Sequence, residues 1–232
     1  MHVRYPVSFT PLFIAIAATI APAAHADETA KQGFVEGSSL NLNARNYYMN
    51  RNRHQQADDN IEWGQGFLGV FESGYTQGTV GFGLDALAMG AIKLDGGRGT
   101  RNTGLLPVHD EGRPADSYGR LALAGKAKLS KTELKVGEWM AVLPILRSDD
   151  GRSLPQTFQG AQLTSNEIAG LTLYGGQFRQ NSERNNASME DMSYGGGLSD
   201  RFNFAGGEYK FNQDRTMVGL WNAELKDVYN QQ

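Results

Sequence analysis

The sequence predicts an all-β fold, specifically an antiparallel transmembrane β-barrel. Three observations support this prediction. Apolar and polar residues alternate with a period of two in segment after segment, long polar stretches and tight turns follow one another along the chain, and the N-terminus resembles an export signal. No helical period is found after that N-terminal segment. A sheet with hydrocarbon on one face and water on the other is consistent with all three observations.

The N-terminal segment has the three parts of a secretory signal peptide. Arg4 supplies the basic start, residues 12–20 form an apolar run, and Ala24-His25-Ala26 is a small-residue cleavage site. We therefore expect a cleaved signal at residues 1–26 and a mature domain at residues 27–232. The alternative, an N-terminal membrane anchor, is disfavoured because the run is shorter than the ~18 residues of a spanning helix. Such a protein would enter the outer membrane as strands.

Composition narrows the class of protein. The chain has no cysteine, so an exported form relies on neither disulfides nor thiolate metal sites. It has 29 glycines and seven prolines, with a mean hydropathy of -0.46, which fits a barrel with a polar interior. The net charge of -3 gives no sign of nucleic-acid binding.

The hairpin at residues 118–140 shows the clearest alternation. Leu121, Leu123 and Leu129 fall on one face, whereas Lys126 and Lys128 fall on the other. The dipeptide at residues 130–131 separates two strands of this kind. The apolar face is predicted to meet lipid and the cationic face to meet water.

The same pattern continues on both sides of this hairpin. Further strands are predicted at residues 39–48, 61–75, 79–94, 156–164, 170–180, 202–211 and 216–225, which gives about nine in all. Long connections at residues 50–60, 95–116, 141–155 and 181–192 are expected at one end of the sheet. Within 170–180, we expect Thr172, Tyr174 and Phe178 to point outward and Gln177 and Arg179 inward.

Two stretches of the chain resemble a known family. They are Trp63-Gly-Gln-Gly-Phe67 followed by Phe71-Glu-Ser-Gly-Tyr-Thr-Gln-Gly-Thr-Val-Gly-Phe-Gly-Leu-Asp-Ala86, and residues 144–150 followed by Leu154-Pro-Gln-Thr-Phe-Gln-Gly-Ala-Gln-Leu-Thr-Ser165. Both are similar to the OprD-type porins of Gram-negative outer membranes. The resemblance implies a selective channel for small carboxylate-bearing solutes, with an eighteen-stranded barrel, a ladder of basic residues, an inward-folded loop and a possible homotrimer.

The predicted strand count is about half of that barrel. Because a single-chain bacterial barrel has an even number of strands and must close, we expect the chain to be an incomplete, N-terminal part of such a barrel. A small complete barrel with a different strand count is the alternative.

Several cations fall on the polar face of their strands. In a barrel that face lines water, where a narrow channel focuses the field of fixed charges on anions. The alternative is a solvated charged face in a soluble sandwich. The predicted basic ladder is Arg45, Arg120, Lys126, Lys128, Lys135 and Arg179.

The connection at residues 141–155 is the candidate constriction. Its apolar residues Val142, Leu143, Ile145 and Leu146 would be poorly placed in water, so we expect the loop to fold into the lumen. That fold would present charges of both signs at a narrow waist. They are Arg147, Asp149, Asp150 and Arg152.

Motifs for other chemistries are not supported. Gly64-x-Gly66-x-x-Gly69 matches a dinucleotide fingerprint, but no helix is predicted after it. Asp149-Asp150-Gly151 lacks the closing glutamate of a calcium loop. His54 and His109 lie in predicted loops without the spacing of a metal site. We therefore expect no catalytic residue, no metal and no cofactor.

The predicted function is selective passive diffusion of small carboxylate-bearing solutes, such as basic amino acids, across the outer membrane. The expected partners are these solutes and outer-membrane lipid and lipopolysaccharide, with no nucleic acid. Two alternatives stay open. One is a barrel with serine-type peptidase activity, because such residue sets assemble in space and not in sequence. The other is a structural or adhesive barrel without a channel.

Overall fold

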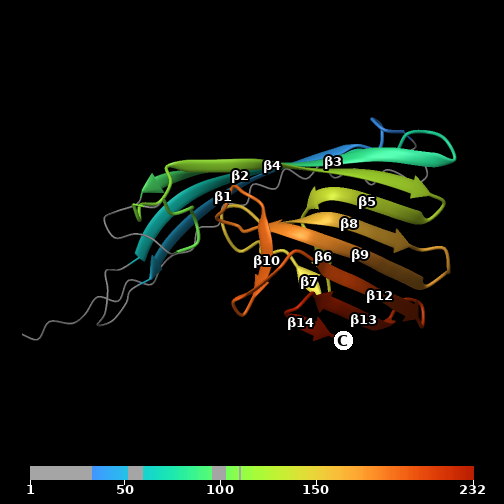
Figure 1. Cartoon of the computed structure of the whole chain (residues 1–232). Helices are drawn as coiled ribbons and strands as arrows, with labels where there is room; N and C mark the ends of the chain where they lie inside the picture. The colour runs from blue at the N-terminus through green and yellow to red at the C-terminus, as the bar shows by residue number, and fades with distance from the viewer. Residues whose placement is uncertain (1–32, 52–59, 96–102, 110) are drawn as a thin grey trace, which may run out of the picture.

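A computed structural model describes residues 33–51, 60–95, 103–109 and 111–232. The predicted signal peptide and His54 lie outside these residues. One antiparallel sheet dominates the fold, with a separate two-stranded hairpin in one connection (Figure 1). No helix in the described residues is long and apolar enough to cross a membrane. The strands are β1 (Ser39–Arg51), β2 (Asn60–Glu72), β3 (Val80–Asp95), β4 (Ser117–Leu129), β5 (Thr132–Trp139), β6 (Val142–Leu143), β7 (Leu146–Arg147), β8 (Thr157–Ser165), β9 (Leu171–Ser182), β10 (Glu190–Tyr194), β11 (Gly197–Ser199), β12 (Phe202–Phe211), β13 (Thr216–Leu225) and β14 (Tyr229–Gln231).

The main sheet is a meander with the order β1-β2-β3-β4-β5-β8-β9-β12-β13-β14. Nine of these strands have eight or more residues in the described part of the chain, and they match the predicted strands in place and number. The prediction of an all-β, antiparallel fold is confirmed. The short strands β6, β7, β10, β11 and β14 were not predicted, because two to five residues are too few to show a period.

All four long connections leave the sheet at the same end, as predicted. Antiparallel pairing places the β1–β2, β3–β4, β5–β8 and β9–β12 connections together and the short turns at the opposite end. The β4–β5 turn is the shortest, and Ser130 adopts a left-handed φ of 55° there. Long and short connections thus alternate as in outer-membrane barrels.

The two faces of the sheet differ as the alternation predicts. Leu121, Leu123 and Leu129 are 59%, 47% and 53% exposed on the convex face. Between them, Ala122 and Ala124 are covered on the concave face. From Gly119 to Leu129, the convex face of β4 is thus an apolar surface with nothing packed on it among the described residues.

In strand β9, the side chains face opposite to the predicted directions. Phe178 pairs with Gly160, Gly160 with Gly137, and Gly137 with Ala124, so Phe178 lies on the concave face. Thr172 and Tyr174 share its parity. Arg179 is left unpaired at a bulge opposite Gln159 and Gly160.

The prediction that Thr172, Tyr174 and Phe178 point outward is therefore wrong. Gln177 lies on the opposite, convex face, and Arg179 donates to its side-chain oxygen over 3.3 Å and pairs with Asp200. Arg179 is consequently not on the concave wall. The physical reason is space for stacked rings inside the curve. A Cβ on Gly176 would meet the Phe204 ring, which stacks on Phe178, and a Cβ on Gly206 would meet the Trp221 ring, which stacks on Tyr174.

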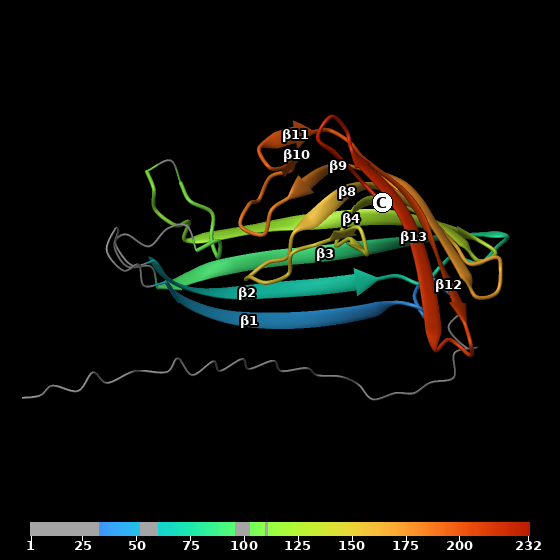
Figure 2. The ribbon, with the colours of Figure 1, turned by 90° about the horizontal axis from the view of Figure 1, so that it is seen from below.

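The connection between β5 and β8 fills the concavity (Figure 2). Ala141 and Leu143 belong to a buried cluster with Phe178 and Phe204 of β9 and β12. Further along the same connection, Leu154 belongs to a second cluster with residues of β2, β3 and β4. One loop that contacts both halves of a curved sheet must lie inside the curve. Val142 is an exception to the expected burial, since it is 69% exposed.

Candidate functional site

The candidate site is built on residues 149–156, which we call the strap. Leu154 is fully buried and anchors the strap on the wall of β2–β4, against Leu68, Met89 and Ala122. Ser153 beside it is also fully buried. The strap thus lies directly on the concave face and turns its first residues toward the space that the sheet surrounds.

Arg45 of β1 holds the near end of the strap. Its Nη2 donates to Asp150 Oδ2 over 3.1 Å, and its Nη1 pairs with the other carboxylate oxygen. Nη1 also lies 3.5 Å from the carbonyl of Arg152. This fork-to-fork geometry is the strongest form of an arginine–carboxylate pair. A basic residue of the wall and an acidic residue of the strap therefore meet across 105 positions of sequence.

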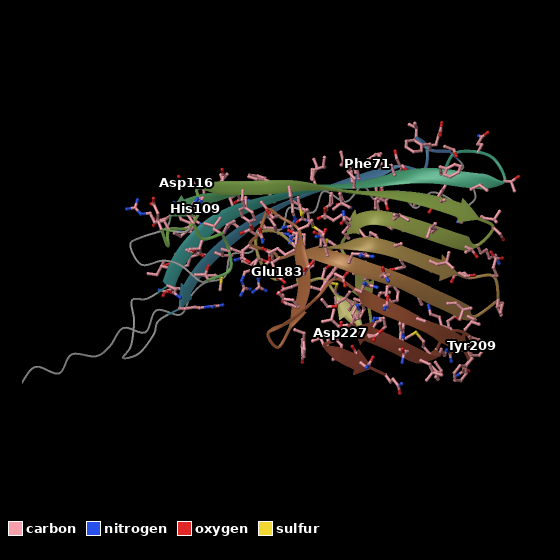
Figure 3. All side chains as sticks on the ribbon, viewed as in Figure 1. Phe71, His109, Asp116, Glu183, Tyr209 and Asp227 are labelled. Atoms are coloured by element: carbon pink, nitrogen blue, oxygen red, sulfur yellow. The ribbon has the colours of Figure 1, made fainter. Side chains whose placement is uncertain are left out.

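Other predicted constriction residues lie beside this pair. Asp149 forms an ion pair with Arg184, which follows β9 and was not predicted. Arg152 donates to the carbonyl of Thr103 over 3.3 Å. Arg147 lies apart from them, exposed on β7 opposite Val142. Three of the four predicted charges are thus brought together, and Arg45 and Arg184 join them. The side chains around Glu183, next to Arg184, crowd this region in Figure 3.

Arg120 faces the concave side but is bound by loops. Its Nη1 donates to the carbonyl of Glu183 over 2.9 Å and to that of Asn186, and its Nη2 donates to the carbonyl of Pro155. The guanidinium therefore joins β4 to the strap and to the connection after β9. Its charge remains near the site, although its terminal donors are occupied.

Lysines occupy the half of the wall near the short turns. Lys126 Nζ and Lys135 Nζ each lie 2.6 Å from a different oxygen of Asp85. Lys126 and Lys128 also lie over the ring of Tyr75, with Nζ 5.1 and 5.5 Å from its centroid. Burial raises the pKa of the Tyr75 hydroxyl, which donates to Glu133. Asp85 is not among the predicted site residues, and no local pattern indicates that one carboxylate would join two lysines.

The predicted ladder residues thus divide into two groups on the concave face. Arg45 and Arg120 lie near the strap, and Lys126, Lys128 and Lys135 lie toward the short turns. Arg120 and Lys126 are six residues apart on β4, which corresponds to about 20 Å. Between them the wall is covered by Leu154. Arg179 belongs to neither group.

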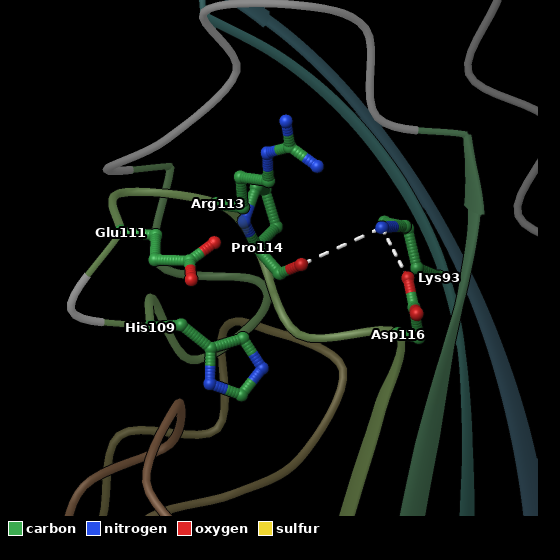
Figure 4. Close-up of a pocket in the computed structure, with 6 residues that line it drawn as sticks. All are labelled: Lys93, His109, Glu111, Arg113, Pro114 and Asp116. Atoms are coloured by element: carbon green, nitrogen blue, oxygen red, sulfur yellow. Dashed lines mark hydrogen bonds and ion pairs between the residues drawn. The ribbon is translucent and has the colours of Figure 1, made fainter.

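A hollow lies at the end of the sheet with the long connections (Figure 4). Its volume is about 490 Å³ and its lining is polar. Lys93 reaches the carbonyl of Pro114 over 3.4 Å and pairs with Asp116, and this contact holds the pKa of the Asp116 carboxyl below its usual range. His109 also lines the hollow. Within the described ranges, no group of three potential metal-ligating side chains is present.

A family model for outer membrane porins of the OprD family matches residues 32–232. The chain belongs to the OprD family of outer-membrane porins. This membership agrees with the curved antiparallel sheet, its apolar convex face and its inward loop. Porins are channels and not enzymes, so the prediction of a non-enzymatic outer-membrane protein is confirmed for the family.

Individual OprD relatives agree with this assignment. A porin-like protein, GalP, from Pseudomonas putida is 63% identical over 205 residues, covering 86% of this chain and 50% of its own length. The crystal structure of a BenF-like porin from Pseudomonas fluorescens Pf-5 gives a TM-score of 0.83 at 60% identity, covering 85% of this chain and 53% of that one. The structure of Pseudomonas aeruginosa OccK2 in complex with glucuronate gives a TM-score of 0.74 at 56% identity, over 86% and 49%. The chain spans about half the length of the curated relatives it matches.

Proposed function

We propose that this chain forms the wall and the waist of a channel for passive diffusion of small carboxylate-bearing solutes across the outer membrane. The observation that carries the proposal is the Arg45–Asp150 pair, in which a cation of the wall faces an anion of the strap. The Asp149–Arg184 pair repeats the same arrangement alongside. In this proposal the remainder of the barrel closes the lumen around these pairs.

The chemistry of the pairs suits exchange with a solute. A solute carboxylate can replace Asp150 on the fork of Arg45, because the guanidinium binds any carboxylate in the same bidentate geometry. A positive group on the same solute would then be met by the carboxylate that was released. Conduction needs such binding to be strong enough for entry and weak enough for exit, and exchange between internal pairs meets both needs.

The lysine group forms a second cationic region along the proposed path of the solute. Lys126 and Lys135 share the carboxylate of Asp85, and Lys128 lies over the ring of Tyr75. We propose that these three cations give the wall beyond the waist its positive field. Low-dielectric walls focus that field along the lumen. We propose that Arg45, Arg120 and these lysines act together as the basic ladder, with Arg120 contributing its charge and not its hydrogen bonds.

The class of solute is proposed from chemistry and from one relative. Glucuronate, the sugar acid in the OccK2 complex, is a small carboxylate. The waist carries charges of both signs, which favours solutes that carry both a carboxylate and a positive group. We therefore propose basic amino acids as the more specific class of solute. We further propose lipid and lipopolysaccharide contacts at the convex face, a cleaved signal at residues 1–26, and a homotrimer as a possible assembly.

The test uses protein purified from outer membranes and reconstituted in planar bilayers. Arg45→Gln and Asp150→Asn each remove one side of the pair, and Lys210→Gln in the exposed end of β12 is the matched control. We expect glucuronate and arginine to block current in the wild type, Arg45→Gln to weaken block by glucuronate, and Asp150→Asn to weaken block by arginine. Unselective current, unaffected by either substitution, would contradict the proposal.

A further inference from the structure

The strap lies unusually close to one position of the wall. A Cβ atom built on Gly66 of β2 would be 2.3 Å from the carbonyl oxygen of Ser153 and 2.9 Å from its carbonyl carbon. Real Cβ atoms do not approach backbone atoms so closely. Gly64, the next residue on the same face, would place its Cβ 3.4 Å from Ser153 Oγ. The strap backbone therefore rests on the bare backbone of β2.

Glycine at position 66 is required by space and not by conformation. Gly66 is not among the described glycines with positive φ, so its backbone is open to any residue. Glycine weakens a strand interior and often marks a close approach of another backbone. The neighbour on the same face, Leu68, carries a large side chain. The missing side chain thus coincides with the point where the strap crosses β2.

The strap has little freedom to move aside. Leu154, directly after Ser153, is fully buried in the wall cluster. On the other side, Arg45 contacts the carbonyl of Arg152, and Arg45 is the register partner of Gly66 on β1. Any atom added at Gly66 therefore presses on a segment that is held at both sides.

We propose that Gly66 is a positioning residue for solute selection: it is the seat that sets how deep the strap lies in the wall and hence how wide the waist is. The inference rests on the proposed channel function. A side chain at position 66 would lift residues 152–154 away from β2 and into the lumen. The Arg45–Asp150 pair would change its spacing at the same time, because Asp150 is carried by the lifted segment. The Gly64-x-Gly66 spacing that resembles a nucleotide fingerprint thus has a role in packing.

The experiment compares Gly66→Ala and Gly66→Val with a matched glycine of the neighbouring strand. Gly90 of β3 has open space around its Cβ position, with no atom within 4 Å, so Gly90→Ala is the control. Single-channel conductance is measured at high salt, where surface charge is screened. We expect Gly66→Ala to lower conductance, Gly66→Val to lower it by roughly half because ion flow follows the open width of a constriction, and Gly90→Ala to leave it unchanged.

A second background separates the seat from a general packing defect. In a variant whose residues 150–153 are replaced by two glycines, Gly66→Val should no longer lower conductance. A folded Gly66→Val protein with wild-type conductance would overturn the proposed role of Gly66. An equal loss of conductance in the shortened background would overturn it as well. Gly66→Ala could also prevent assembly of the full-length loop. In that case, assembly of the same substitution in the shortened background supports the proposed role of Gly66, and failure to assemble in both backgrounds overturns it.

Failure of this inference is distinguishable from failure of the proposed function. A wild-type channel that conducts without preference for carboxylates contradicts the proposed function, yet the conductance of Gly66 variants still decides the seat. Conversely, if the wild type prefers carboxylates but the Gly66 variants keep wild-type conductance, only the proposed role of Gly66 is contradicted.

Discussion

Among single residues of the concave face, Arg120 combines a structural role with the charge proposed for the ladder. Three backbone carbonyls from two connections accept from its guanidinium. Lysine keeps the charge but offers a compact ammonium in place of a planar fork. The charge and the clamp are therefore separable by one substitution.

Arg120→Lys should lower the free energy of unfolding by about 1–3 kcal/mol, because buried carbonyls lose charged hydrogen-bond donors. Ion selectivity should change little, since the positive charge remains. Urea unfolding in detergent and reversal potentials measure the two effects. Lys128→Gln is the opposite control, with altered selectivity and unchanged stability, and an Arg120→Lys protein of wild-type stability would contradict the clamp.

Asp85 limits the positive field of the lysine group. Asp85→Asn should strengthen anion preference, because Lys126 and Lys135 lose the carboxylate that lies 2.6 Å from each of them. The change should shrink with rising salt, which screens charges over about 10 Å at 0.1 M. Reversal potentials at several salt concentrations measure it. Asp214→Asn, in the exposed turn after β12, is the control, and an unchanged preference in Asp85→Asn would mean that this carboxylate does not shape the field.

At the scale of elements, each strand has a lipid-facing row whose tolerance depends on depth. Leu123 lies in the middle of β4, whereas Leu129 ends it beside the turn. Leu123→Arg should cost about 2–4 kcal/mol and Leu129→Arg about 0–1 kcal/mol, because the cost of a lipid-facing cation falls from the bilayer midplane to the interface. Refolding into vesicles at graded urea measures both. Equal costs would show that the convex face of β4 does not cross the membrane.

The short turns also carry an element-scale prediction. Glu167, between β8 and β9, accepts from the amide of Lys131 over 2.8 Å and from the hydroxyls of Ser130 and Thr132 over 3.0 Å each. These bonds, the Lys131 amide first, lower the pKa of the Glu167 carboxyl. A lowered folded-state pKa stabilises the turn above the ordinary glutamate range, and this contribution is lost as pH falls through the lowered value.

Hydrogen exchange of the Lys131 amide tests this pH dependence. Protection of this turn amide relative to the amides of β5 should fall as the pH drops below the ordinary glutamate range. Glu167→Gln should show the weaker protection at every pH. If protection of the Lys131 amide in the wild type does not depend on pH, the Glu167 carboxylate does not stabilise this turn.

The strands could be predicted because each carries its own signal. Alternation of a few residues placed Leu121, Lys126 and their neighbours on the correct faces. It failed in β9, where Leu171 and Leu173 on one face compete with Tyr174 and Phe178 on the other, so that both faces carry apolar residues. The contacts of the strap were beyond prediction, since partners such as Arg45 and Asp150 are 105 residues apart and no local pattern links them.

At the scale of the whole molecule, the sheet is an oriented object. It has an apolar convex face and a charged concave face. The sheet is curved, with long connections at one end and turns at the other (Figures 1 and 2). These two polarities were predictable, because alternation reports the first and connection length reports the second. The depth to which the strap enters the concavity could not be predicted from the sequence. It depends on the missing side chain at Gly66 and on the buried side chain of Leu154.

The connection between β5 and β8 also dictates an order of assembly. Its later part docks on β2–β4, which precede it in the chain, whereas Leu143 docks on Phe178 and Phe204, which follow it. The loop therefore reaches its final position only after β9 and β12 have joined the sheet. A nascent sheet that lacks those strands can seat Leu154 but not Leu143, so in the proposed channel the waist is fixed from both sides only after β9 and β12 are in place.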